Sequence, residues 1–251
     1  MNDPLAKYSY RDIAKAIDHS LLRPELDDAF VEDGCRLALE YDVASVCVRP
    51  VDVARAREIL AGSDVAVGTV IGFPHGSHRT ETKLFEARQA LSDGATELDM
   101  VIDIGALKSG RDEDVQADIA AVVTVAHEGG AIVKVIFENA YLSDEEKVRA
   151  CQAAEAAGAD FVKTSTGFAA SGATHEDLML MRRSVSPHVQ VKAAGGVRSL
   201  DALVAVMELG VSRAGATQTK AILDDFRARK SGTAGADSPQ PVAAGSDAGA
   251  Y

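Results

Sequence analysis

Three lysines stand at the same position in three short and similar segments of the sequence. Lys134 lies in AIVKVIFE, Lys163 in DFVKTSTG and Lys192 in VQVKAAGG, and 29 residues separate each lysine from the next. Each segment is rich in valine and isoleucine, which is typical of a buried β-strand. Lysine is rare in such places because its ammonium group must lose water. The repeat therefore indicates a site built from the ends of successive parallel strands, and it favours amine chemistry, of which Schiff-base catalysis is the sharpest form.

The chain repeats a strand followed by a helix about every 30 residues. Strands are expected near residues 16–20, 44–48, 67–71, 97–102, 132–137, 161–165, 189–193 and 212–214. Amphipathic helices are expected at residues 27–41, 51–60, 80–92, 112–128, 143–157, 175–183 and 199–209. Such a repeat predicts a parallel sheet with helical crossovers, and eight strands close into an α/β fold, the (βα)8 TIM barrel. An open sheet of six to eight strands is the alternative.

The 251 residues fit one barrel followed by a short tail, because barrels of this class take about 250 residues. Residues 1–230 are expected to form the barrel. Residues 231–251, which are rich in glycine, alanine, serine and proline, are expected to form a flexible tail that ends in Tyr251.

Charge and hydropathy exclude several classes of partner. The net charge of −12 disfavours binding to nucleic acid or to an anionic membrane surface. The sequence shows no apolar signal core at its start and no apolar run of about 20 residues. Three cysteines without metal-ligand spacing favour a reducing, cytoplasmic setting. The expected partners are small molecules, and a homodimer is the assembly common among such barrels, although no surface patch in the sequence is diagnostic of it.

Alternation along the strands orients the lysines. Valines flank Lys134 on both sides and precede Lys163 and Lys192, and the apolar Leu98 and Met100 flank Asp99. Because successive side chains on a strand point to opposite faces, the apolar residues should pack under the helices. The three lysines and Asp99 are therefore expected to point into the barrel.

Two interpretations of these charged residues remain open at the level of the sequence. Lys163 and Lys192 are either ion-paired lysines at strand ends, or a nucleophilic amine beside a second ammonium that lowers its pKa. Periodicity alone does not say which of the two is the nucleophile. Asp99 is either their counter-ion or a general acid/base, and Lys134 either contacts substrate or balances Asp99.

Glycine-rich turns follow the last three strands. Gly167 lies in the first, Gly195 and Gly196 lie in the second, and Gly215 and Thr217 lie in the third. Glycine can simply mark a tight turn, but in barrels the loops after the last strands often bind phosphate through backbone N–H groups. The three turns together predict a phosphorylated substrate. His75 and His78 lack a third ligand at suitable spacing, so no metal site is predicted.

Taken together, the sequence resembles the deoxyribose-phosphate aldolase family of class I aldolases. The segments that carry the resemblance span about residues 16–217, and FVKTSTGF and VKAAGGVRS are the most specific of them. The other matching segments are AIDHSLLRP, ASVCVRP, TVIGFPHG, TETKLFEA, GATELDMVID, GAT and SRAGA. The resemblance implies a cofactor-free lyase of deoxyribonucleotide catabolism. Such an enzyme reversibly cleaves 2-deoxy-D-ribose 5-phosphate to D-glyceraldehyde 3-phosphate and acetaldehyde.

The resemblance also implies roles for individual residues. Lys163 would form the Schiff base, Lys192 would lower the pKa of Lys163, and Asp99 would be the acid/base partner acting through a water molecule. Tyr251 matches a terminal tyrosine that assists proton transfer in some members. Substrate-binding positions would be Asp18, Ser20, Cys47, Lys134 and Thr166, and phosphate-binding positions would be Gly167, Gly195, Gly196, Gly215 and Thr217. Departures from the family pattern occur at Arg49, Asp103 and Gln218.

Two other functions compete with this one. A Schiff-base aldolase or transaldolase for another phosphorylated sugar would share the lysines, and substrate profiling would separate it. A phosphosugar-binding barrel without catalysis would not need two neighbouring lysines that face the barrel interior together with Asp99.

Overall fold

The computed structural model describes residues 5–232 and shows eight parallel strands that close into a barrel. The strands follow one another in chain order around the barrel, and β8 pairs with β1 to close it. Their bounds are β1 Ile17–Leu21, β2 Ser45–Val48, β3 Ala66–Ile71, β4 Glu97–Val101, β5 Ile132–Ile136, β6 Phe161–Lys163, β7 Gln190–Ala194 and β8 Arg213–Ala216. The predicted (βα)8 barrel is confirmed, and the open sheet is excluded.

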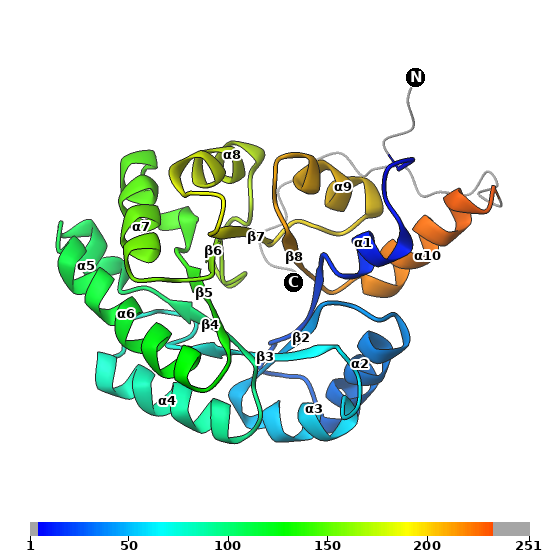
Figure 1. The fold of residues 1–251 in the computed structure, drawn as a ribbon, viewed down its shortest axis with the longest axis horizontal. Helices are drawn as coiled ribbons and strands as arrows, with labels where there is room; N and C mark the ends of the chain where they lie inside the picture. Colours follow the sequence, from blue (N-terminus) through cyan, green and yellow to red (C-terminus); the bar gives the residue numbers. More distant parts are fainter. Residues whose placement is uncertain (1–4, 233–251) are drawn as a thin grey trace.

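The helices surround the strands as an outer ring (Figure 1). The main helices are α2 Asp28–Glu40, α3 Val53–Ile59, α4 Thr80–Ser92, α6 Asp112–Glu128, α7 Asp144–Ala156, α8 His175–Ser184, α9 Leu200–Glu208 and α10 Thr219–Lys230. Two shorter helices, α1 Tyr10–Ala14 and α5 Ile104–Lys108, and two single 3₁₀ turns, Pro50–Asp52 and Asn139–Tyr141, complete the set. All seven helices expected from the sequence are present. The helices α1, α5 and α10 were not expected; α1 and α5 have only five residues each, too few for a periodic pattern.

Local sequence signals explain where these helices begin and end. The Ser143 side chain accepts a hydrogen bond from the backbone N–H of Glu146, and the Glu146 side chain accepts one from the backbone N–H of Ser143, so α7 starts with a complete capping box. Gly158 follows the same helix with φ of +79°, a conformation that favours glycine, and turns the chain into β6.

The two faces of the strands have opposite character. On the outer face Val133, Val135, Val162 and Val191 are fully buried and belong to the hydrophobic core between strands and helices. The inner face of the same strands carries the lysines, and Lys134 is also almost completely buried. The predicted alternation is therefore confirmed, and the barrel interior is a packed, charged layer enclosed by an apolar shell.

Strand register sets the relative height of the inward side chains. Asp99 on β4 is level with Lys134 on β5, and Lys163 on β6 is level with Lys192 on β7. Asp18 on β1 is level with Gly215 on β8. Residues far apart in the sequence are therefore brought to one site by neighbouring strands. Among residues 5–232, no helix has the length and apolar character needed to cross a membrane.

Candidate active site

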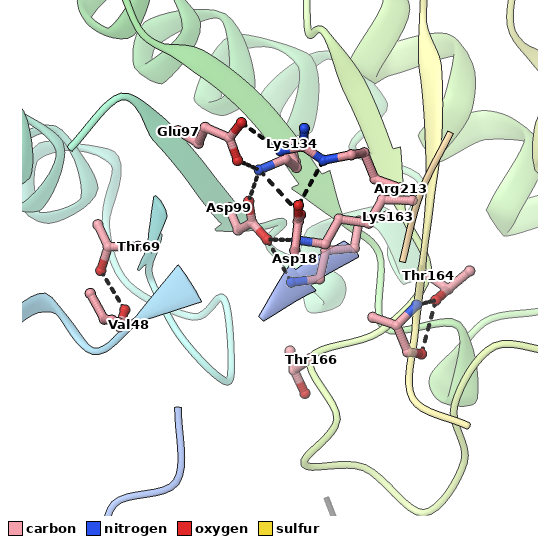
Figure 2. A network of polar contacts seen from close by, with 12 residues as sticks. Asp18, Val48, Thr69, Glu97, Asp99, Lys134, Lys163, Thr164, Thr166 and Arg213 are labelled. Carbon is pink, nitrogen blue, oxygen red and sulfur yellow. Dashed lines mark hydrogen bonds and ion pairs between the residues drawn. The ribbon is translucent and has the colours of Figure 1, made fainter. Parts of the chain in front are cut away.

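The inward charges form one continuous network, which we call the buried charge cluster. It consists of Asp18, Glu97, Asp99, Lys134, Lys163, Lys192 and Arg213. Figure 2 shows the labelled side chains of Asp18, Glu97, Asp99, Lys134, Lys163 and Arg213 converging in the barrel interior. The sequence predicted five of these seven residues as parts of a site. It missed Glu97 and Arg213.

Asp99 is the common acceptor of the three lysines. Its Oδ1 accepts a hydrogen bond from Lys134 Nζ at 3.0 Å, and its Oδ2 accepts from Lys163 Nζ and Lys192 Nζ, each at 2.7 Å. Lys163 and Lys192 therefore meet at a single oxygen atom. Burial alone would raise the pKa of Asp99, but the surrounding ammonium groups outweigh it and hold that pKa well below its ordinary value.

The three lysines differ in how they hold a proton. Burial lowers the pKa of Lys163, and the neighbouring Lys192 lowers it further, so that the attraction of Asp99 does not restore the ordinary value. Burial also acts on Lys192, but Asp18, whose carboxylate lies 2.5 Å from Lys192 Nζ, and Asp99 raise its pKa above the ordinary value. Lys134 is likewise raised, by Asp99, Glu97 and Asp18. Lys163 is thus the member of the triplet that loses a proton most readily.

A narrow pocket opens above Lys163 and Lys192. Its lining is Asp18, Ser20, Leu22, Cys47, Lys163, Thr166, Lys192, Ala194, Gly195 and Gly215. The thiol of Cys47 is buried beside Leu22 and Val70, and burial raises its pKa to about 11. Cys47 therefore provides a small neutral wall to the pocket, whereas the two lysines provide its reactive floor.

The glycine turns stand where two loops touch. Gly195 and Gly196 have φ of +80° and +96°, and Gly167 has φ of +88°. A side chain at Gly195 would come within 2.8 Å of the Cα atom of Gly172, in the loop between β6 and α8. The backbone N–H of Ala173 donates to the carbonyls of Ala194 and Gly195, at 3.0 and 3.1 Å. The turn after β7 and the loop after β6 are thus held together at the rim of the pocket.

Glu138 is a further functional candidate that the sequence analysis did not name. It follows β5 with φ of +58°, which is unusual for a residue other than glycine. Its carboxylate accepts hydrogen bonds from both the backbone N–H and the hydroxyl of Thr166, which in turn lines the pocket. Burial raises the pKa of Glu138. A positive φ cannot be read from a glutamate in a sequence, so no local signal marked this residue.

The structure does not gather every predicted residue around the pocket. Thr217 is exposed and lines a different groove, with His19 and Phe30. Lys134 and Asp99 lie below the pocket floor. Asp99 contacts Lys163 in that floor, and Lys134 contacts Asp99. Tyr251 lies outside the described residues, as does most of the predicted tail. Within residues 5–232, no three His, Cys, Asp or Glu side chains are arranged to hold a metal ion.

Comparisons with known proteins place the chain in a family. Residues 13–236 match the model of the DeoC/LacD family aldolases. The chain belongs to this aldolase family. A deoxyribose-phosphate aldolase of Geobacillus sp. (strain WCH70) is 52% identical over 213 residues, which are 85% of this chain and 95% of the relative. That of Thermococcus gammatolerans is 52% identical over 218 residues, which are 86% of this chain and 97% of the relative.

Solved structures agree with this family assignment. The deoxyribose phosphate aldolase from Aeropyrum pernix, described as tetrameric, matches this aldolase with a TM-score of 0.83 and 32% identity, over 90% of this chain and 96% of its own. An aldolase called QR15 matches with a TM-score of 0.83 and 36% identity, over 87% of this chain and 97% of its own. The expected homodimer of this aldolase stays a prediction.

Proposed function

We propose that this aldolase reversibly cleaves 2-deoxy-D-ribose 5-phosphate to D-glyceraldehyde 3-phosphate and acetaldehyde through a Schiff base on Lys163. Relatives about 50% identical over nearly their whole length carry the name deoxyribose-phosphate aldolase. The observation that carries the mechanism is the difference among the lysines. Lys163 has a lowered pKa and lines the pocket, whereas the pKa values of Lys192 and Lys134 are raised. A free amine is the form that attacks an aldehyde.

Lys192 and Asp99 complete the reactive centre in this proposal. The Lys192 ammonium repels a proton on Lys163 and is itself kept charged by Asp18. In the resting enzyme Asp99 is held as a carboxylate by the ammonium groups of Lys134 and Lys192, and its Oδ2 also accepts a hydrogen bond from Lys163. Once Lys163 is joined to the substrate as an imine, Asp99 would act as the general base that accepts a proton through a water molecule. The counter-ion and the acid/base role are thus successive states of one residue.

Substrate would lie with its aldehyde on Lys163 and its phosphate at the pocket rim. Ser20, Thr166 and Cys47 line the space between and would contact the sugar carbons and hydroxyls. The backbone N–H groups near Gly167, Gly195, Gly196 and Gly215 would receive the phosphate dianion. Thr217 lines a different groove and is given no part in holding the phosphate. The Thr166 hydroxyl is oriented by Glu138 and also accepts a hydrogen bond from the backbone N–H of Phe168, at 3.0 Å.

The reaction then follows from the imine. The Lys163 amine adds to C1 of the open-chain sugar, and loss of water gives a protonated imine. Asp99, through water, takes the proton of the C3 hydroxyl, the C2–C3 bond breaks, and its electron pair moves into the imine to give an enamine. Glyceraldehyde 3-phosphate leaves, C2 takes a proton, and water releases acetaldehyde and restores the amine.

Borohydride trapping tests the proposal. Reducing the protein in the presence of 2-deoxyribose 5-phosphate should fix a carbon adduct on Lys163, located by peptide mass spectrometry. Lys163→Ala should show no adduct and no turnover while keeping its circular dichroism spectrum. An adduct on Lys192 or Lys134 would reassign the nucleophile. Folded protein that binds the sugar phosphate without any adduct would overturn the catalytic function in favour of a binding barrel.

A further inference from the structure

Arg213 and Glu97 form an ion pair below the pocket that none of the proposed chemical steps uses. Arg213 Nη2 lies 2.5 Å from Glu97 Oε1, and Arg213 Nε lies 2.6 Å from Asp18 Oδ1. The side chains are only 15% and 7% exposed. Neither residue lines the pocket over Lys163. A guanidinium and a carboxylate are costly to bury, so their presence in the barrel interior calls for a reason beyond packing.

The reason lies in the charge count of the buried charge cluster. Its carboxylates are Asp18, Glu97 and Asp99, and its basic residues besides Lys163 are Lys134, Lys192 and Arg213. Three negative charges therefore already face three positive charges when Lys163 is neutral. A proton on Lys163 would leave one unbalanced positive charge within the cluster, where charges are poorly solvated. Glu138, which also faces Lys163, lies outside the cluster and is hydrogen-bonded to Thr166.

Contacts link the lower pair to Lys163 through a short chain of ions. Glu97 Oε2 accepts a hydrogen bond from Lys134 Nζ at 2.5 Å, and Lys134 also donates to Asp99, which holds Lys163. The titratable groups that face Lys163 are Asp99 from β4, Lys192 from β7, Cys47 from β2 and Glu138 after β5. The groups that face the lower pair are Asp18 from β1 and Lys134 from β5. Two of these cations also lie near the aromatic ring of Phe161. The ring centroid is 6.0 Å from the Arg213 guanidinium and 5.9 Å from Lys134 Nζ.

We propose that Glu97 and Arg213 are positioning residues with opposite and compensating effects on the proton of Lys163, so that burying them as a pair leaves Lys163 in the free-amine form. The inference rests on the proposed function of Lys163 as the Schiff-base nucleophile. It assigns the two residues opposite effects: Arg213 favours release of the Lys163 proton, and Glu97 favours its retention. Together they cancel, which is why the pair can be buried there without disturbing the amine.

The acid limb of the pH profile of kcat/KM measures this balance, because it reports ionisation of the free enzyme. Arg213→Gln leaves three carboxylates facing two cations, so Lys163 should retain its proton and the limb should move up by about one pH unit. Glu97→Gln should move the limb down by a similar amount. The double variant Glu97→Gln/Arg213→Gln removes one charge of each sign and should return the limb to within ~0.3 pH unit of the original protein.

Three controls separate charge from architecture. Arg213→Lys keeps the charge but loses the fork that reaches both Asp18 and Glu97, so it should keep the limb in place even where stability falls. Asp177→Asn breaks a similarly close ion pair outside the barrel, with Lys147 at 2.6 Å, and should change stability without moving the limb. Labelling of the Lys163 amine by cyanate across the same pH range, followed by mass spectrometry, should show the same shifts without turnover.

Each variant has a result that supports the proposal and a result that overturns it. Shifts of opposite sign that cancel in the double variant support the proposal. Equal shifts in Arg213→Gln and Arg213→Lys, or an unmoved limb in Glu97→Gln, overturn it and leave the pair a structural element. If Arg213→Gln does not fold, Glu97→Gln and Arg213→Lys still decide by these criteria. Failure to trap Lys163 in the original protein would instead overturn the proposed function.

Discussion

The inner and outer faces of β5, β6 and β7 are equally buried but are built on opposite principles. Val133 and Lys134 are neighbours in one strand and are 0% and 1% exposed. The valine is stabilised by apolar area removed from water, whereas the lysine is stabilised by Glu97 and Asp99 within 3.0 Å. A buried position is therefore defined by what balances the side chain in it. On the inner face, buried charges are balanced by charges of opposite sign, and the same charges determine which lysine loses its proton.

Removing the second ammonium should have the largest effect. Lys192→Leu should lower kcat/KM for 2-deoxyribose 5-phosphate by about 10³-fold or more, because Lys163 then retains its proton. Steady-state kinetics would measure the loss, and circular dichroism should show an intact fold. Activity within tenfold of the original protein would show that the inner-face lysines act independently.

Lys134→Met should be the most destabilising substitution at a single inner-face residue. It removes the cation that contacts all three carboxylates of Glu97, Asp99 and Asp18, and breaking a buried pair on one side costs about 3–5 kcal/mol. Denaturant unfolding would measure the change in the free energy of unfolding. A loss below ~1 kcal/mol would mean that the remaining cations compensate fully.

His19 tests the comparison between the two faces of the strands, because it is a titratable group on the outer, apolar face. It is buried, with Nδ1 2.8 Å from the hydroxyl of Thr219, and burial lowers its pKa from 6.5 to about 4. The folded state thus binds fewer protons than the unfolded state between these values, so the contribution of His19 to stability is complete above pH 6.5 and is lost as the pH falls to 4. The full loss is about 3 kcal/mol.

His19→Asn should remove that part of the pH dependence. The difference in unfolding free energy between His19→Asn and the original protein should change by up to ~3 kcal/mol from pH 7 to pH 4. Denaturant unfolding at a series of pH values would follow it, and the carboxylates common to both proteins cancel in the difference. A constant difference would assign the acid sensitivity of this region to other groups.

Val133→Ala should be the smallest of these effects. It removes two methyl groups from the outer face and should cost about 2 kcal/mol of stability through lost burial and a small cavity. Its kcat and KM should stay within about twofold of the original values, because no charge on the inner face changes. A large kinetic effect would show that packing behind the strand also tunes the lysines.

Periodicity was enough to predict the barrel, the phase of its strands and the inward direction of the lysines and Asp99. It could not identify the nucleophile, because the pKa of Lys163 depends on a sum over side chains from several strands. Glu97 and Arg213 were missed although they stand two residues before Asp99 and Gly215, in the same inward phase. A charged residue at the first position of a strand is hard to distinguish in sequence from a solvated strand end.

The misses among local elements have simpler causes. Strand β8 lies further along the chain than expected, at Arg213–Ala216, because Gly215 was interpreted as a turn residue, whereas it pairs with Asp18 in the ladder. Strand β6 is shorter than expected and ends at Lys163, after which Thr164 continues the pairing through its side chain, which accepts from Ala194 N–H at 3.0 Å. Sequence patterns register side-chain type and cannot show where a hydroxyl replaces a backbone partner.

The contact between Gly172 and Gly195 limits how this pocket can be redesigned. A methyl group at either position would meet the other backbone at under 3.0 Å, and Ala173 fastens the same two segments by hydrogen bonds. The loop after β6 and the turn after β7 are thus a single interlocked unit. If one of these segments were replaced by that of a relative to enlarge the rim, it would not pack correctly unless the other segment were replaced as well. Loop exchange in this barrel should therefore be planned in pairs.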